Sequence, residues 1–125
     1  MSKLIMVMLG GALGSGSRYL LASWVQKIAN NPFFPYGTLA VNLIGCLLIG
    51  FLTSLATTKG YFTPQTRRFI LVGFLGGFTT FSTFSNETFS LITDTQYITA
   101  SLNIIVSVFL GLAGVWIGNI LSNAL

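Results

Sequence analysis

The chain has 125 residues, of which 53% are hydrophobic and 6% are charged. A soluble domain carries about 25% charged residues, so six basic and two acidic side chains cannot coat a water-soluble globule of this length. Basic residues this few and this scattered also make no phosphate-binding face, so we expect no nucleic-acid partner. The composition instead predicts a protein embedded in a lipid bilayer.

Four apolar stretches are long enough to cross that bilayer, since a transmembrane helix needs about 20 residues. They cover residues 4–25, 37–57, 67–92 and 97–122. The first begins like a secretory signal, but apolar residues resume beyond Arg18 and three more stretches follow, which favours a membrane helix. The sequence therefore predicts an all-α membrane protein, with residues 1–125 forming a single four-helix domain.

Glycines in two of these spans are spaced four residues apart, as in Gly10 with Gly14 and Gly114 with Gly118. Small residues at this spacing let helix backbones approach closely where lipid supplies no hydrophobic drive. We expect these glycines to serve helix packing. Four helices filled with Phe and Leu can close around their own core, so a polar pathway would form more naturally between protomers of a twofold dimer.

Catalytic side chains are scarce. The sequence has no His, the single thiol of Cys46, and only Glu87 and Asp94 as acids. Paired carboxylates, a thiol with an imidazole, and a set of metal-ligating side chains are therefore missing from the sequence. We expect a protein that is not an enzyme.

Two polar side chains stand out within the first two spans, and each has two interpretations. Arg18 either extends to the lipid headgroups or lies near a water-filled vestibule. Asn42 either ties two helices together or offers its amide to an anion. In the fourth span, Ser107 can bond back to its own helix.

The third span is interrupted by a polar, aromatic and glycine-rich segment at residues 73–89. Gly76 and Gly77, followed by the β-branched Thr79 and Thr80, weaken the helix at this point. A break here would free backbone carbonyl oxygens, which suit a small cation. The segment therefore predicts a helix break inside the membrane.

Two phenylalanines follow the expected break, and polar residues lie between them. Phe81 and Phe84 are three residues apart, so on a helix they share a face. The edge of an aromatic ring is positive and could touch an anion, while Ser82 and Thr83 could donate hydrogen bonds. Packing or lipid contact would explain the two rings equally well.

Three segments together carry a family resemblance. They are Gly10-Gly-Ala-Leu-Gly-Ser-Gly-Ser-Arg18, Gly37-Thr-Leu-Ala-Val-Asn-Leu-Ile-Gly45 and Gly76-Gly-Phe-Thr-Thr-Phe-Ser-Thr-Phe-Ser85. The second and third resemble the two signatures of the Fluc (CrcB) fluoride channel family, and the first is similar to that family's first helix. The likeness covers the whole chain, in size and in the order of its four helices.

The resemblance implies an antiparallel, dual-topology dimer with two fluoride pores in the cell's inner (plasma) membrane, exporting cytoplasmic fluoride passively. Asn42 resembles the family's pore asparagine, and Phe81 and Phe84 resemble its aromatic pair. The polar track would include Thr38, Ser82 and Thr83, with Ser107 as a candidate from the fourth helix. Backbone carbonyls of Gly76 and Thr79 resemble those that hold a structural sodium ion, and Arg18 matches an arginine whose role stays open.

Two other function classes fit a small four-helix membrane protein. A small multidrug exporter, which couples cation export to protons, needs an acid in its first helix, and this chain has Arg18 there instead. A non-conducting accessory or holin-like subunit would not need the Gly-Gly break and the residues that follow it.

The basic residues bear on orientation. Lys3, Lys59, Arg67 and Arg68 lie on the side of both termini, whereas Lys27 lies in the opposite first loop. That imbalance favours cytoplasmic termini, while the resemblance implies both orientations. A homologous partner chain of opposite orientation therefore remains an alternative to self-pairing.

Overall fold

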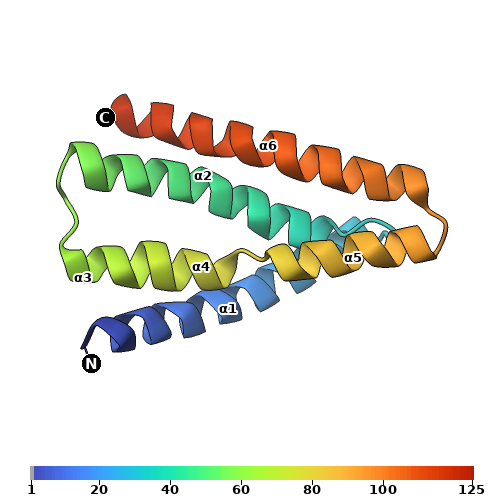
Figure 1. Ribbon diagram of the computed structural model, residues 1–125, viewed down its shortest axis with the longest axis horizontal. Coiled ribbons are helices and arrows are strands. Elements are labelled where there is room, and N and C mark those ends of the chain that lie inside the picture. Colours follow the sequence, from blue (N-terminus) through green and yellow to red (C-terminus); the bar gives the residue numbers. More distant parts are fainter. Residues whose placement is uncertain (1) are drawn as a thin grey trace.

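The computed structural model describes residues 2–125 and contains four helical segments that are long and apolar enough to span a membrane. They are α1 (Ser2–Ala29), α2 (Tyr36–Thr58), a composite third segment (Pro64–Thr93) and α6 (Tyr97–Asn123). The described residues include no β-strand. Both ends of the chain lie at the same end of the bundle (Figure 1). The predicted all-α architecture is confirmed, and each predicted span lies within one of these helical segments.

The third segment is built from four pieces: α3 (Pro64–Arg67), η1 (Arg68–Phe74), α4 (Leu75–Phe78) and α5 (Phe81–Thr93). Thr63 starts it by accepting a 3.2 Å hydrogen bond from the Thr66 amide, and Pro64 fills the first helical position, where its missing N–H costs nothing. The piece η1 is a π-helix, and its widened winding continues to the Leu75 N–H, which bonds the carbonyl of Ile70. The expected break between α4 and α5 is confirmed.

The loop between α1 and α2 is fastened by one side chain. Gln26 donates to the carbonyls of Asn31 at 2.6 Å and Phe34 at 3.1 Å, and its Oε1 accepts from the Gly37 amide at 3.0 Å. Asn30 adopts φ 48°, a left-handed conformation that Asn tolerates better than most residues. The end of α1 and the start of α2 are thereby held in a fixed relation.

Glycines allow close contact between α1 and the third segment. A Cβ on Gly10 would meet the backbone of Phe69 and Phe74, and one on Gly14 would meet the carbonyl of Phe74. From the other side, a Cβ on Gly77 would lie 2.6 Å from the carbonyl oxygen of Gly11. The packing role predicted for Gly10 and Gly14 is confirmed.

The helices α2 and α6 form the second close pair, and Figure 1 shows them running alongside each other. A Cβ on Gly118 would overlap the carbonyl of Leu47, and one on Gly50 would overlap that of Val115. Gly114 is less crowded, because its nearest neighbour would be the Cys46 Cβ at 3.5 Å. Glycines thus allow two close helix pairs, α1 with the third segment and α2 with α6.

Candidate functional site

The break in the third segment spans two residues with extended backbone. α4 ends at Phe78, Thr79 has ψ 158°, and Thr80 has φ −150° and ψ 122°. Thr80 then caps α5, since its hydroxyl oxygen accepts a 3.2 Å hydrogen bond from the Thr83 amide. Threonine suits this position because its short side chain satisfies an N–H that the helix start leaves free.

Asn42 on α2 holds the break from the side. Its Nδ2 donates to the Thr80 carbonyl at 2.9 Å, and its Oδ1 accepts from the Thr80 amide at 2.8 Å. One side chain therefore bonds both backbone groups of Thr80 and satisfies its N–H, which has no helical partner. An Asn amide carries two N–H donors, so one remains for another partner. Of the two interpretations from sequence, the helix-tying role is realised and a donor is still left over.

The break leaves several carbonyl oxygens without helical partners, and those of Gly76 and Thr79 are two of them. In an unbroken helix, the Gly76 carbonyl would bond the Thr80 amide, which bonds Asn42 instead. The Thr79 carbonyl would likewise bond the Thr83 amide, which bonds the Thr80 hydroxyl. The Leu75 carbonyl, by contrast, accepts from both the amide and the hydroxyl of Thr79.

A cavity of about 420 Å³ lies beside the break, and we call it the middle cavity. It gathers six of the residues predicted from sequence: Asn42, Gly76, Thr79, Phe81, Phe84 and Ser107. The rings of Phe81 and Phe84 are tilted at 43°, with centroids 5.8 Å apart. Phe81 is 79% exposed on the protomer. The helix break, the remaining Asn42 donor and the aromatic pair thus meet at one place.

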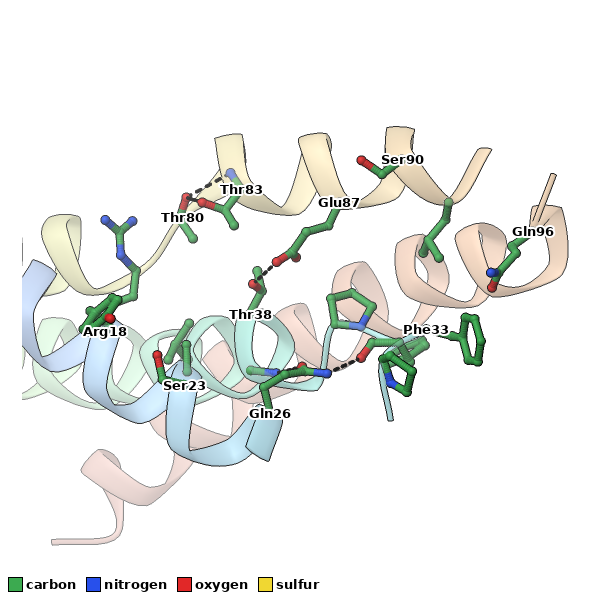
Figure 2. Close-up of a pocket in the computed structure, with 18 of the residues that line it drawn as sticks. Arg18, Ser23, Gln26, Phe33, Thr38, Thr80, Thr83, Glu87, Ser90 and Gln96 are labelled. Carbon is green, nitrogen blue, oxygen red and sulfur yellow. Dashed lines mark hydrogen bonds between the residues drawn. The ribbon is translucent and has the colours of Figure 1, made fainter. Parts of the chain in front are cut away.

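A second and larger cavity, about 750 Å³, lies toward the end of the bundle that is opposite the chain termini, and we call it the vestibule. Arg18, Thr38 and Thr83 from the sequence prediction line it, whereas Ser82 lines neither cavity. Figure 2 shows Arg18 extending from α1 and Glu87 extending from α5 toward α2. Thr80 lines both cavities, so the two adjoin at the break.

Glu87, near the end of the third span, is partly buried at the vestibule. Its Oε1 accepts a 2.8 Å hydrogen bond from the hydroxyl of Thr38, which is only 8% exposed. Its other oxygen, Oε2, is buried without a hydrogen-bond partner among the described residues. A usable signal was the spacing of Thr80, Thr83 and Glu87 at i, i+3 and i+7, which places them along one helix face.

Comparison with known proteins decides the family. The family described as CrcB-like protein, Camphor Resistance (CrcB), matches residues 5–119. The chain belongs to this family.

Several similar proteins carry the name fluoride-specific ion channel FluC. The chain is 47% identical to the one from Geobacter sulfurreducens over 118 residues, covering 94% of each chain. It is 46% identical to that of Citrifermentans bemidjiense over 125 residues, covering all of both chains. It is 49% identical to that of Elusimicrobium minutum over 109 residues, covering 87% of this chain and 84% of the relative. The family resemblance seen in the sequence is thereby confirmed.

The family match covers both cavities of the candidate site. The matched region, residues 5–119, includes all of the middle cavity and all of the vestibule. Sequence reasoning missed Thr80 as a site residue. Thr80 caps α5, forms hydrogen bonds with the Asn42 side chain and lines both cavities. Its place directly after the weakened Gly76–Thr79 turn was the available signal.

Proposed function

We propose that this protein is a fluoride-selective channel, through which cytoplasmic fluoride leaves the cell passively and fluoride toxicity is reduced. The observation that carries the proposal is the meeting of Asn42, Phe81 and Phe84 around the break, in one cavity. The name shared by relatives of 46–49% identity supports fluoride as the permeant ion.

The chemistry of the middle cavity suits a small anion. Fluoride is strongly hydrated, so a pore has to replace its water with hydrogen-bond donors that converge at close range. The second N–H of Asn42 and the hydroxyl of Ser107 are such donors, and positive ring edges add a weaker attraction. The two rings pack against each other, with centroids 5.8 Å apart, and present one aromatic surface at this cavity.

A dimer would complete this site. Phe81 is 79% exposed although its neighbours line the middle cavity, so a partner surface is needed to enclose the pathway. We propose an antiparallel homodimer with one pathway along each protomer, because a twofold axis lets the same surface face itself. A homologous chain of opposite orientation would enclose the site in the same way.

The freed carbonyls fit a structural sodium ion. Hard cations prefer oxygen ligands, and the oxygens of Gly76 and Thr79 both belong to residues of the middle cavity and lack helical partners. Two protomers would supply four such oxygens. We propose that sodium bound there ties the two protomers together and does not permeate.

Four membrane-type helices support a multi-pass membrane protein, and export of cytoplasmic fluoride requires that the membrane be the cell's inner (plasma) membrane. The proposed activity needs no catalytic step and no proton coupling. Glu87 and Asp94 are the only acids in the chain, and Glu87 is engaged with Thr38.

The test is ion efflux from liposomes that contain the purified protein, measured with fluoride and with chloride electrodes. We expect fluoride to leave and chloride to be retained. Proton-driven uptake of an organic cation would instead support the multidrug exporter, and no flux of any ion would support the accessory subunit. Either result would overturn the proposed function.

A further inference from the structure

A third cavity, about 330 Å³, lies between α2 and α6 near the end of the bundle that holds both chain termini. Its lining comes from the last turns of the two helices: Ile49, Gly50, Thr53, Ser54, Thr57, Val115 and Asn119. We call it the terminal cavity. Nothing in the motifs or in the site described above involves its polar side chains.

The terminal cavity adjoins the middle cavity through one residue. Ile49 lines both, just as Thr80 lines both the middle cavity and the vestibule. Along α2, Asn42, Ile49 and Thr53 follow one another, and Ile49 is about 10 Å from Asn42 and 6 Å from Thr53 along the helix axis. The three cavities therefore succeed one another from one end of the protomer to the other.

Two hydrogen-bond donors of the terminal cavity are uncommitted. Asn123 Nδ2 donates to Asn119 Oδ1 at 3.2 Å, and Ser54 donates to Asn123 Oδ1 at 3.2 Å. This chain fixes the amide orientation of Asn119 and leaves its Nδ2 without a partner among the described residues. The hydroxyl of Thr53 likewise has no hydrogen-bond partner among the described residues.

Thr57 differs from Thr53, although both line the same cavity. Its hydroxyl already bonds carbonyls of its own helix, those of Thr53 at 3.0 Å and Ser54 at 3.1 Å. Thr57 therefore offers the same volume and chemistry without an available proton. It provides a matched control within the cavity.

The charge of this end suits an anion. Lys3 lies in the first turn of α1, Lys59 follows α2, and Arg67 and Arg68 lie at the start of the third segment, all toward the chain termini. The two acids of the chain, Glu87 and Asp94, belong to the vestibule at the opposite end. A field of one sign raises the local concentration of ions of the other sign.

We propose that the terminal cavity is an anion-binding mouth of the pathway, in which Thr53 and Asn119 donate hydrogen bonds to a small anion. Ile49 is the apolar constriction between this mouth and the middle cavity. That the anion is fluoride rests on the proposed function.

The first test is fluoride efflux from liposomes with Thr53→Val, Asn119→Leu and the matched Thr57→Val. Each of the first two removes a free donor, and we expect efflux to fall about 10-fold, the factor that corresponds to one lost hydrogen bond to an ion. Thr57→Val should conduct like the wild type. Ile49→Trp should block efflux while the protein elutes as the wild-type oligomer.

The second test does not depend on flux. In a Cys46→Ala background, Asn119→Cys should react rapidly with a charged, water-soluble thiol reagent. Leu121→Cys is the control, because Leu121 is exposed on the same helix, as Asn119 is, but does not line the terminal cavity. Faster labelling at position 119 supports a water-filled mouth.

The outcomes separate the two proposals. If the wild type conducts fluoride while Thr53→Val and Asn119→Leu conduct equally well, the proposed anion-binding role of the terminal cavity is wrong. The proposed channel function is then unaffected. Equal labelling at positions 119 and 121 overturns the mouth as well, since these polar groups then simply face the lipid headgroups. If the wild type conducts no fluoride, the channel function fails first and fluoride binding at the mouth fails with it.

Discussion

Asn42 and Thr80 form a two-point contact, in which one side-chain amide bonds both the N–H and the carbonyl of Thr80, at 2.8 and 2.9 Å. The residues are 38 positions apart in the chain. The contact satisfies the backbone at the break, and Asn42, which lines the middle cavity, keeps a second N–H. Structure and proposed transport therefore depend on the same side chain.

The first prediction concerns this contact. Asn42→Asp would set a carboxylate oxygen against the Thr80 carbonyl and place a negative charge where an anion passes. Loss of a hydrogen bond in the interior costs about 1–3 kcal/mol, so we expect fluoride efflux to fall at least about 5-fold. Asn86→Asp on α5 is the control, because its side chain is exposed. Wild-type efflux by Asn42→Asp would remove Asn42 from the pathway.

The second prediction concerns the aromatic pair. Phe81→Ile and Phe84→Ile keep an apolar side chain but remove the positive ring edges, so both should lose fluoride efflux while remaining folded. Phe89→Ile, on the same helix and 64% exposed, is the control and should conduct normally. If all three variants conduct alike, the rings serve packing or lipid contact only.

Sequence reasoning located the break because its causes are local. Gly76, Gly77 and the β-branched threonines that follow weaken a helix wherever they occur. The packing glycines of α1 were equally visible, because their spacing of four is a property of one helix. Features of this kind need no knowledge of the partner segment.

Two features depended on distant parts of the chain and were not predicted. Thr38 and Glu87 are 49 positions apart, so nothing local relates the hydroxyl to the carboxylate. The π-helix η1 has the sequence of an ordinary apolar helix, and its backbone at Phe69 and Phe74 lies against Gly10 of α1. In both cases tertiary contact decides the conformation.

The third prediction uses two glycines of α1 that differ only in surroundings. A Cβ at Gly14 would overlap the carbonyl of Phe74, whereas a Cβ at Gly16 would meet no atom within 4 Å. Gly14→Ala should destabilise the fold by about 1–3 kcal/mol. Gly16→Ala should stabilise it by roughly 0.5–1 kcal/mol, since alanine restricts the unfolded chain. Thermal unfolding in detergent measures both, and equal midpoints would contradict the close contact.

The fourth prediction concerns sodium. Exchange of all sodium for a large organic cation such as N-methylglucamine should weaken the dimer or abolish fluoride efflux, because the carbonyls of Gly76 and Thr79 would lose the ion that they share. Readdition of sodium should restore both properties, which distinguishes a bound ion from irreversible damage. An unchanged dimer and unchanged efflux after exhaustive exchange would count against the site.

The fifth prediction concerns orientation in the membrane. Both termini lie at one end of the bundle (Figure 1), where Lys59 follows α2, whereas Lys27 lies in the last turn of α1 and not in the loop that the sequence predicted for it. The positive-inside rule alone would place that end in the cytoplasm. An antiparallel homodimer, however, requires half of the chains to be inverted. A cysteine added after Leu125 in a Cys46→Ala background, labelled with an impermeant reagent in intact cells, should react in part before permeabilisation and fully afterwards. Reaction only after permeabilisation would exclude self-pairing in cells and require a homologous partner chain of opposite orientation.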